Sequence, residues 1–509
     1  MLEHARATKN DFWKKMRKSS LIAVLYLLGL VGVVLVISYY FMMNESIRLD
    51  EAQSIWQSSH SLGRTLEIVA QDVHVPMYHI LLHYWMIIFG TGVEAARAMS
   101  MLFFVLSIFV VYLLARTVLS LRWALVLATL FALSPFMNWY ANEARMYTLL
   151  TFFTLLSQYF FVRILQHKQG WGGYAITAII GVYSHYFFLF TLLAQAAYYL
   201  FNRKKFSAGS FKKFIAVAVG SLLSLVPWIY YFVQQGSADN TRPLLQTPST
   251  VDFFNAFSQF MFGFQTDAVN SIILSAWPLL VVVAFMTVKR KLSIDISVGY
   301  LLLAGLLPVV FAFILSFVVT PFFVSRYMMP AVAPLYIVAA WLISRYSKKI
   351  AIPMLVVWAM TIGYMFYLQM SSPLNSVRED YKDAATYIEE HATFNDVVAL
   401  TSPFTVYPFE YSYNGTSQVR TIPLWDRQNE GGIPAFDATK LKSEVDTLIS
   451  GHDYIYVLAS HDQGYEDEVV NYFVQRYEQT HEEKYSEDMT LHVFRVGYNN
   501  RPLIEPSRP

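Results

Sequence analysis

Long apolar runs, separated by short polar or basic segments, are the dominant pattern along the chain. The first run, Leu21 to Met43, covers 23 residues, and a membrane-spanning helix needs about 20. Because Lys and Arg stay on the cytoplasmic side of a membrane, the basic clusters fix which way each run crosses. This pattern predicts about eleven spans, near residues 21–43, 94–116, 122–140, 146–166, 171–184, 186–201, 214–233, 268–288, 297–319, 327–344 and 350–370.

One further apolar run, residues 76–90, does not fit this parity. If it crossed the membrane, the basic clusters that follow would all fall on the outer side. We therefore expect a re-entrant or juxtamembrane helix there, covered by protein or by a cavity. The predicted fold class is a polytopic α-helical membrane protein.

Composition supports this class. The 509 residues are 55% hydrophobic and have a mean hydropathy of +0.39, too apolar for a soluble enzyme. The formal net charge is only +2, and we expect no nucleic-acid partner. The chain has no cysteine, which excludes disulfides, thiolate chemistry and cysteine metal sites.

The two ends of the chain differ from the apolar middle. A basic segment ending in "FWKKMRKSS" precedes the first run, which has no small-residue cleavage pattern after it, so a retained signal anchor with a cytoplasmic N-terminus is expected. Residues 375–509 carry 23 acids against 11 basic residues and alternate helical stretches with short β-rich runs, typical of a soluble α/β domain. The predicted domains are a cytoplasmic tail (1–20), a transmembrane module (21–372, first outer loop 44–93) and an extracytoplasmic α/β domain (373–509).

Several ionisable side chains lie at the outer ends of the predicted spans. They occur in "SIRLDEAQSIW", "DVHVPMYHILLHYW", "LSPFMNWYANEARMYTLL" and "TPFFVSRYMMP", with one more histidine in "YSHYFFLF". A charged group at the centre of a membrane helix costs about 2.5–3.5 kcal/mol, so such groups usually face a functional cavity. We expect one outward-facing site made by Asp50, Glu51, Asp72, His74, Glu143, Arg145, His185 and Arg326.

These segments, in this order over residues 21–345, resemble the GT-C superfamily of polytopic glycosyltransferases. Within it they are similar to the protein O-mannosyltransferases and the lipid A aminoarabinose transferases (glycosyltransferase family 39-like). The resemblance implies a sugar transfer, with inversion, from a polyprenyl-phosphate carrier to a hydroxyl on the outer face. The chain has "HVP" where this branch often has histidine-proline-proline, and it lacks the lysine of the aminoarabinose transferases there. The identity of the donor sugar therefore does not carry over.

The chemistry of such a transfer needs a base for the incoming hydroxyl and stabilisation of the departing phosphate. Asp50 and Glu51 directly follow the first span, and the resemblance makes the acid of "LDE" the catalytic one. We expect Asp50 to be the base, while Glu51 is the second catalytic candidate. The alternative for either acid is that it solvates the loop or caps the helix that follows.

Two arginines are candidates for binding the donor phosphate, because a guanidinium matches phosphate oxygens. Arg326 is preferred over Arg145, since it begins an apolar helix; an interfacial arginine that only snorkels to water is the alternative. Asn138, Asn142 and Arg145 lie at i, i+4 and i+7, which predicts one helical face toward a cavity.

The remaining candidates are expected to bind substrate: Asp72, His74, Glu143, Tyr147 and His185. Glu143 either binds the acceptor or a divalent ion, or forms a salt bridge to Arg145 or Arg97. A divalent metal is an optional cofactor, with Glu143, His74 and His185 as candidate ligands. Tyr147 fits sugar stacking and an interfacial aromatic belt equally well.

The sequence therefore predicts an inverting, polyprenyl-phosphate-sugar-dependent glycosyltransferase of a bacterial plasma membrane. Its acceptor is a glycan, a lipid or a protein, and membrane lipids surround it. Two other classes stay open: a lipid or solute transporter, and a membrane receptor or scaffold that uses its outer domain for recognition.

Overall fold

The computed structural model describes residues 2–72, 74–167, 169–235, 245–264, 294–371, 379–427, 433–486 and 488–497. The chain divides into two compact units. Unit 1 consists of residues 1–43, 97–229 and 244–371, and unit 2 consists of residues 44–96, 230–243 and 372–509. Unit 2 therefore joins the first loop to the C-terminal domain, although the two are far apart in sequence.

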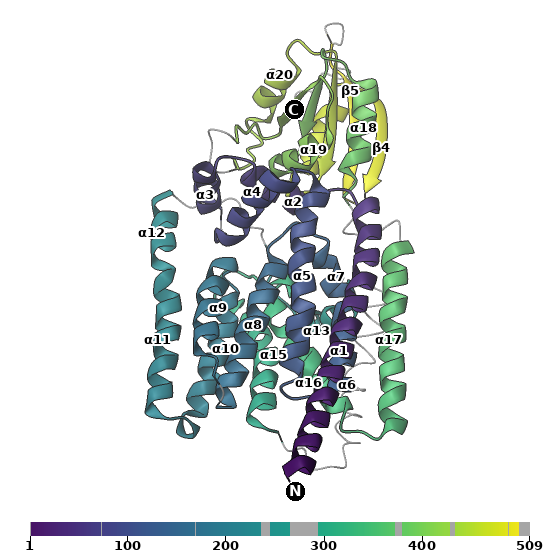
Figure 1. Cartoon of the computed structure of the whole chain (residues 1–509). Coiled ribbons are helices and arrows are strands. Elements are labelled where there is room, and N and C mark those ends of the chain that lie inside the picture. The colour runs from purple at the N-terminus through teal and green to yellow at the C-terminus, as the bar shows by residue number, and fades with distance from the viewer. Residues whose placement is uncertain are drawn as a thin grey trace. The chain divides into compact units, whose positions relative to one another are not determined.

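Unit 1 is a helical array that makes the chain an integral membrane protein (Figure 1). Seven helical spans among the described residues are long and apolar enough to cross a bilayer, or eight if the bent pair α6–α7 counts as one. The helices are α1 (Leu2–Asn44), α5 (Val93–Ala115), α6 (Leu121–Ala132), α7 (Pro135–Ala141), α8 (Tyr147–Leu165), α9 (Trp171–Ser184), α10 (Phe188–Phe201), α11 (Ala208–Ser224), α12 (Val226–Gln235), α13 (Thr250–Phe262), α15 (Ile296–Leu315), α16 (Met329–Ile343) and α17 (Lys348–Ser371).

Most predicted spans coincide with these helices. The helices α9 and α10 have only 14 residues each, as their short apolar runs required. The span predicted at 268–288 lies outside the described residues, so the total of eleven stays a prediction.

Buried polar side chains link the helices of unit 1. The Gln158 amide of α8 donates to the carbonyl of Pro330 on α16 (3.1 Å), and the Gln195 amide of α10 donates to Ser157 of α8 (3.0 Å). The Tyr174 hydroxyl of α9 donates to Gln195 (3.0 Å). Since lipid offers no water to these groups, their partners must come from neighbouring helices.

Unit 2 begins with three short helices from the first loop: α2 (Leu49–Ser58), α3 (Leu62–Gln71) and α4 (Met77–Phe89). With 13 residues, α4 is shorter than a bilayer span requires. Its His79 and His83 imidazoles lie 3.1 and 3.0 Å from oxygens of Ser58 on α2. The interpretation of residues 76–90 as a helix that does not cross stays a prediction.

The C-terminal part of unit 2 is the predicted α/β domain (Figure 1). Its described residues form a five-stranded sheet in the order β2-β1-β3-β5-β4, parallel between β2, β1 and β3 and antiparallel elsewhere. The strands are β1 (Val397–Leu400), β2 (Gln418–Thr421), β3 (Tyr454–Ser460), β4 (Glu478–Ser486) and β5 (Met489–Arg495). The helices are α18 (Tyr381–His391), α19 (Val406–Ser412), α20 (Leu441–Ile449) and α21 (Glu466–Val474).

Candidate active site

The start of α2 carries the two candidate catalytic acids. Glu51 is fully buried, and its carboxylate accepts the backbone N–H of Arg48 at 3.0 Å, which forms half of a capping box. Asp50 is only half-buried. The capping role foreseen for one of the two acids therefore falls on Glu51, and this favours Asp50 as the base.

Asp72 and His74 lie close to α2 within the same unit. Asp72 is the residue that follows the last residue of α3. Its carboxylate accepts hydrogen bonds from the side-chain amides of Gln57 (2.9 Å) and Gln53 (3.3 Å), both on α2. The His74 ring stacks on His79 of α4, with ring centroids 6.1 Å apart. Unit 2 thus brings together four of the predicted site residues, from Asp50 to His74.

In unit 1, Glu143, Arg145 and Tyr147 lie where the chain turns from α7 into α8. All three side chains are buried, with at most 5% of their surface exposed. The backbone N–H of Arg145 donates to the carbonyl of Glu143 at 2.7 Å, and the Ser100 hydroxyl of α5 donates to the Arg145 carbonyl at 3.2 Å. These contacts fix the polar turn against α5.

The predicted single helical face of Asn138, Asn142 and Arg145 is wrong. The helix α7 ends at Ala141, and α8 begins only at Tyr147. The Asn138 amide donates to the carbonyls of Ala132 (2.7 Å) and Ser134 (2.9 Å), beside the 58° bend between α6 and α7. Asn138 therefore satisfies carbonyls at this bend that would otherwise lack partners, while the Asn142 amide, at the other end of α7, donates to the carbonyl of Asn138 (2.9 Å).

Aromatic contacts join three other predicted residues of unit 1. The Tyr147 ring lies 6.1 Å from the imidazole of His185, which in turn lies 6.2 Å from the ring of Tyr327. The Arg326 guanidinium carbon lies 5.5 Å from the Tyr327 centroid, in the short 3-10 helix Ser325–Met328 that precedes α16. The backbone N–H of Phe187 donates to Nδ1 of His185 at 3.1 Å and fixes its ring.

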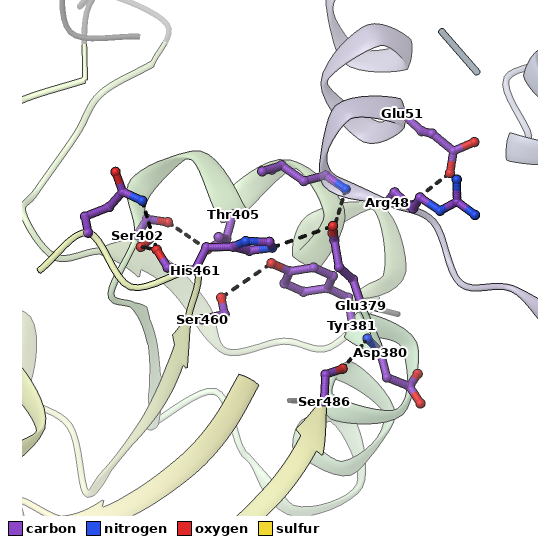
Figure 2. Close-up of polar contacts among 12 residues, drawn as sticks. Arg48, Glu51, Glu379, Asp380, Tyr381, Ser402, Thr405, Ser460, His461 and Ser486 are labelled. Atoms are coloured by element: carbon purple, nitrogen blue, oxygen red, sulfur yellow. Dashed lines mark hydrogen bonds and ion pairs between the residues drawn. The ribbon is translucent and has the colours of Figure 1, made fainter. Parts of the chain in front are cut away.

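Two residues of unit 2 were not found from the sequence. The Glu379 carboxylate accepts the backbone N–H of Leu49, at the start of α2, at 2.7 Å, and lies 3.7 Å from Nε2 of His461 (Figure 2). Burial lowers the pKa of His461, but the neighbouring acids Glu379, Asp488 and Asp50 outweigh it, so the pKa is raised overall. No local signal marks either residue, since Glu379 is 330 positions from Leu49.

A metal site is not assembled within the described residues, where no three His, Asp or Glu side chains group so as to hold an ion. The metal suggested for Glu143, His74 and His185 stays a prediction.

Comparison with known proteins gives the class of the fold. Residues 73–231 match the family described as dolichyl-phosphate-mannose-protein mannosyltransferase, and this segment includes His74, Glu143, Arg145, Tyr147 and His185. The sequence matches none of the curated proteins with which it was compared.

Among solved structures, the chain is similar to ArnT from Cupriavidus metallidurans. In the apo state the TM-score is 0.59 at 12% identity, over 93% of this chain and 98% of ArnT. For ArnT bound to undecaprenyl phosphate the TM-score is 0.56 at 14% identity, over 92% and 98% of the two chains. The predicted resemblance to GT-C polytopic membrane glycosyltransferases is thereby confirmed.

Proposed function

We propose that the chain transfers a sugar from a polyprenyl-phosphate carrier to an acceptor hydroxyl of a glycan, lipid or protein at the outer face of a bacterial plasma membrane. The observation that carries the proposal is the fold shared with ArnT over 93% of the chain. ArnT has been solved with undecaprenyl phosphate bound, and the matched family is described as using dolichyl-phosphate-mannose.

In the proposed reaction, Asp50 accepts the proton of the acceptor hydroxyl. The hydroxyl oxygen attacks the anomeric carbon from the face opposite the carrier, and the bond between that carbon and the phosphate oxygen breaks. The polyprenyl phosphate leaves with the bonding electrons. Because a phosphate is already a good leaving group, no strong general acid is needed. The sugar configuration inverts because the new bond forms opposite the old one.

The roles of the other residues follow from their contacts. Arg326 leads the proposal for binding the departing phosphate, since its guanidinium lies beside Tyr327 near His185, and a charge-assisted hydrogen bond to phosphate is strong. Arg145 is the second phosphate candidate. Tyr147, Glu143, His185, Asp72 and His74 are proposed to contact the sugar or the acceptor.

The test is release of the carrier. Purified protein in lipid nanodiscs receives a panel of undecaprenyl-phosphate-linked sugars, beginning with mannose, and free undecaprenyl phosphate is measured. We expect at least one donor to be consumed, and faster with a hydroxyl acceptor present. A transporter or a receptor binds the same lipids and leaves them intact, so binding without release of undecaprenyl phosphate across the panel contradicts the proposal.

The same assay addresses the metal. If a divalent ion held by Glu143, His74 or His185 takes part, EDTA stops release and added Mg²⁺ or Mn²⁺ restores it. Unchanged turnover in EDTA removes the metal from the proposal and leaves the transferase intact.

A further inference from the structure

The first turn of α2 depends on an acid from the C-terminal domain. The first N–H groups of a helix have no partner inside the helix. Glu51 accepts the N–H of Arg48 (3.0 Å), but the N–H of Leu49 donates to Glu379 (2.7 Å), two residues before α18 (Figure 2). A carboxylate at a helix N-terminus is doubly favourable, because it accepts the hydrogen bond and faces the positive end of the helix dipole.

A second contact fastens the same two segments. The Ser46 hydroxyl, just before α2, donates to the Asp380 carboxylate at 3.2 Å. The backbone N–H of Asp380 donates to the Ser486 hydroxyl at the end of β4, at 2.9 Å (Figure 2). Asp380, which binds Ser46, is therefore itself attached to the sheet.

His461 holds the other oxygen of Glu379 from the end of β3. Its φ of +53° is a left-handed conformation that a non-glycine residue adopts only when its surroundings require it. The N–H of His461 donates to the carbonyl of Asp488 (3.3 Å), and its own carbonyl accepts the Ser402 hydroxyl (2.8 Å). These bonds hold the strained backbone, and the imidazole points at Glu379 (Figure 2).

We propose that Glu379, held by His461, is a positioning residue for Asp50. The inference rests on the proposed function of Asp50 as the base. Asp50 directly follows Leu49, so any shift of the Leu49 N–H moves the carboxylate of Asp50 with it. A misplacement of about 1 Å at a reacting group can cost about 100-fold in rate. The α/β domain is thus a support for the catalytic helix.

The test compares Glu379→Ala with wild type, using the undecaprenyl-phosphate-linked sugar that wild type consumes. We expect kcat to fall about tenfold, with KM for the donor unchanged, because in the proposal Glu379 acts through α2. Glu379→Gln should recover most of the loss, since its amide oxygen still accepts the Leu49 N–H. Donor-lipid binding stoichiometry and the unfolding temperature show whether a lower kcat only reflects fewer folded molecules.

Leu49→Pro provides a partner for a double-mutant cycle. Proline is accepted at the first helical position, and the Arg48 ψ of 157° suits a residue before proline. This variant removes the N–H that Glu379 binds, so kcat should fall as it does in Glu379→Ala. In the double variant, kcat should be less than twofold below that of either single variant. If Glu379→Ala does not fold, Leu49→Pro decides alone, and a wild-type kcat in it overturns the proposal.

Glu478→Ala is the matched control, because Glu478 pairs with Arg495 (3.6 Å) at the start of β4, at the opposite end of that strand from Ser486. It should keep the wild-type kcat. The positioning role is overturned if the loss of kcat in the double variant equals the product of the two single losses. A wild-type kcat in Glu379→Ala also overturns it. An active Asp50→Asn variant instead overturns the assignment of Asp50 as the base, so the two failures are distinguishable.

Discussion

The indole ring of Trp56 lies 5.0 Å from the phenol ring of Tyr407, so α2 of the first loop packs directly against α19 of the α/β domain. The Arg427 guanidinium lies over both rings, 5.4 Å from Trp56 and 5.3 Å from Tyr407, and pairs with Glu410. Cation–π contacts of this kind stabilise the packing in addition to the burial of the rings. The loop and the domain therefore pack together in one compact unit.

Removal of this contact should destabilise unit 2. Tyr407 is 9% exposed, and replacing a buried aromatic ring by alanine costs about 3 kcal/mol. For a unit of this size, that corresponds to a fall of roughly 6–12 °C in the unfolding temperature of Tyr407→Ala. Phe394→Ala, at an aromatic side chain that is 74% exposed, is the control and should unfold as wild type does. Equal unfolding temperatures for both variants would show that the loop does not depend on α19.

Arg326→Ala should weaken binding of the donor lipid. Loss of a charge-assisted phosphate contact costs about 1.5–3 kcal/mol, or roughly 10- to 150-fold in Kd. Arg345 offers a matched control, since its guanidinium also lies over an aromatic ring, 4.9 Å from Trp341, just after α16 ends. We expect Arg345→Ala to bind undecaprenyl phosphate as wild type does. Equal affinities in the two variants would make Arg326 an interfacial arginine without a ligand.

The α/β domain should lose stability as pH rises. Burial and repulsion by Asp462, Asp467 and Asp488 raise the pKa of Glu466 from 4.5 to about 7. A raised carboxyl pKa means that the folded state holds a proton that the unfolded state has lost, so stability falls between pH 4.5 and 7. The raised pKa of His461 acts in the same direction, because its contribution is complete below pH 6.5 and disappears above its folded pKa.

Glu466→Gln tests this directly. Because Glu466 is partly exposed, solvent screening reduces the expected gain at pH 8 to about 1 kcal/mol. The variant should unfold at a higher temperature than wild type at pH 8 and show a flatter pH dependence from pH 5 to pH 7. Glu468→Gln, at an exposed position two residues further along α21, should change neither. A wild-type pH dependence in Glu466→Gln would contradict the raised pKa.

The predicted orientation can be measured with single cysteines, since the chain has none. A cysteine at the exposed Phe394 should react with a membrane-impermeant thiol reagent on intact cells, whereas one at the exposed Lys204 should not. Reaction at Lys204 and protection at Phe394 would reverse the orientation. Reaction at both would mean that the number of crossings between them is even, and that the assigned parity is wrong.

The sequence predicted the helical spans well, because a bilayer span needs a minimum length of apolar residues, and such runs are visible in the sequence. It failed at Arg145, where regular periodicity was extended past the end of α7 at Ala141 and through the turn that precedes α8. It chose Asp50 over Glu51 as the base, but only the fold shows that Glu51 is buried as a cap. Glu379 was not predictable, since its partner lies 330 residues earlier and no pattern connects them.

The most direct test of the account is turnover by Asp50→Asn, which keeps the shape of the side chain and removes the base. Loss of a general base typically costs 10²–10⁴-fold, so release of undecaprenyl phosphate should fall at least about 100-fold while donor binding and the unfolding temperature stay at wild-type values. Glu67→Gln, at a partly exposed acid of the same loop paired with Arg64 at 2.8 Å, is the control and should turn over normally. Near wild-type release by Asp50→Asn would contradict the assignment of Asp50 as the base.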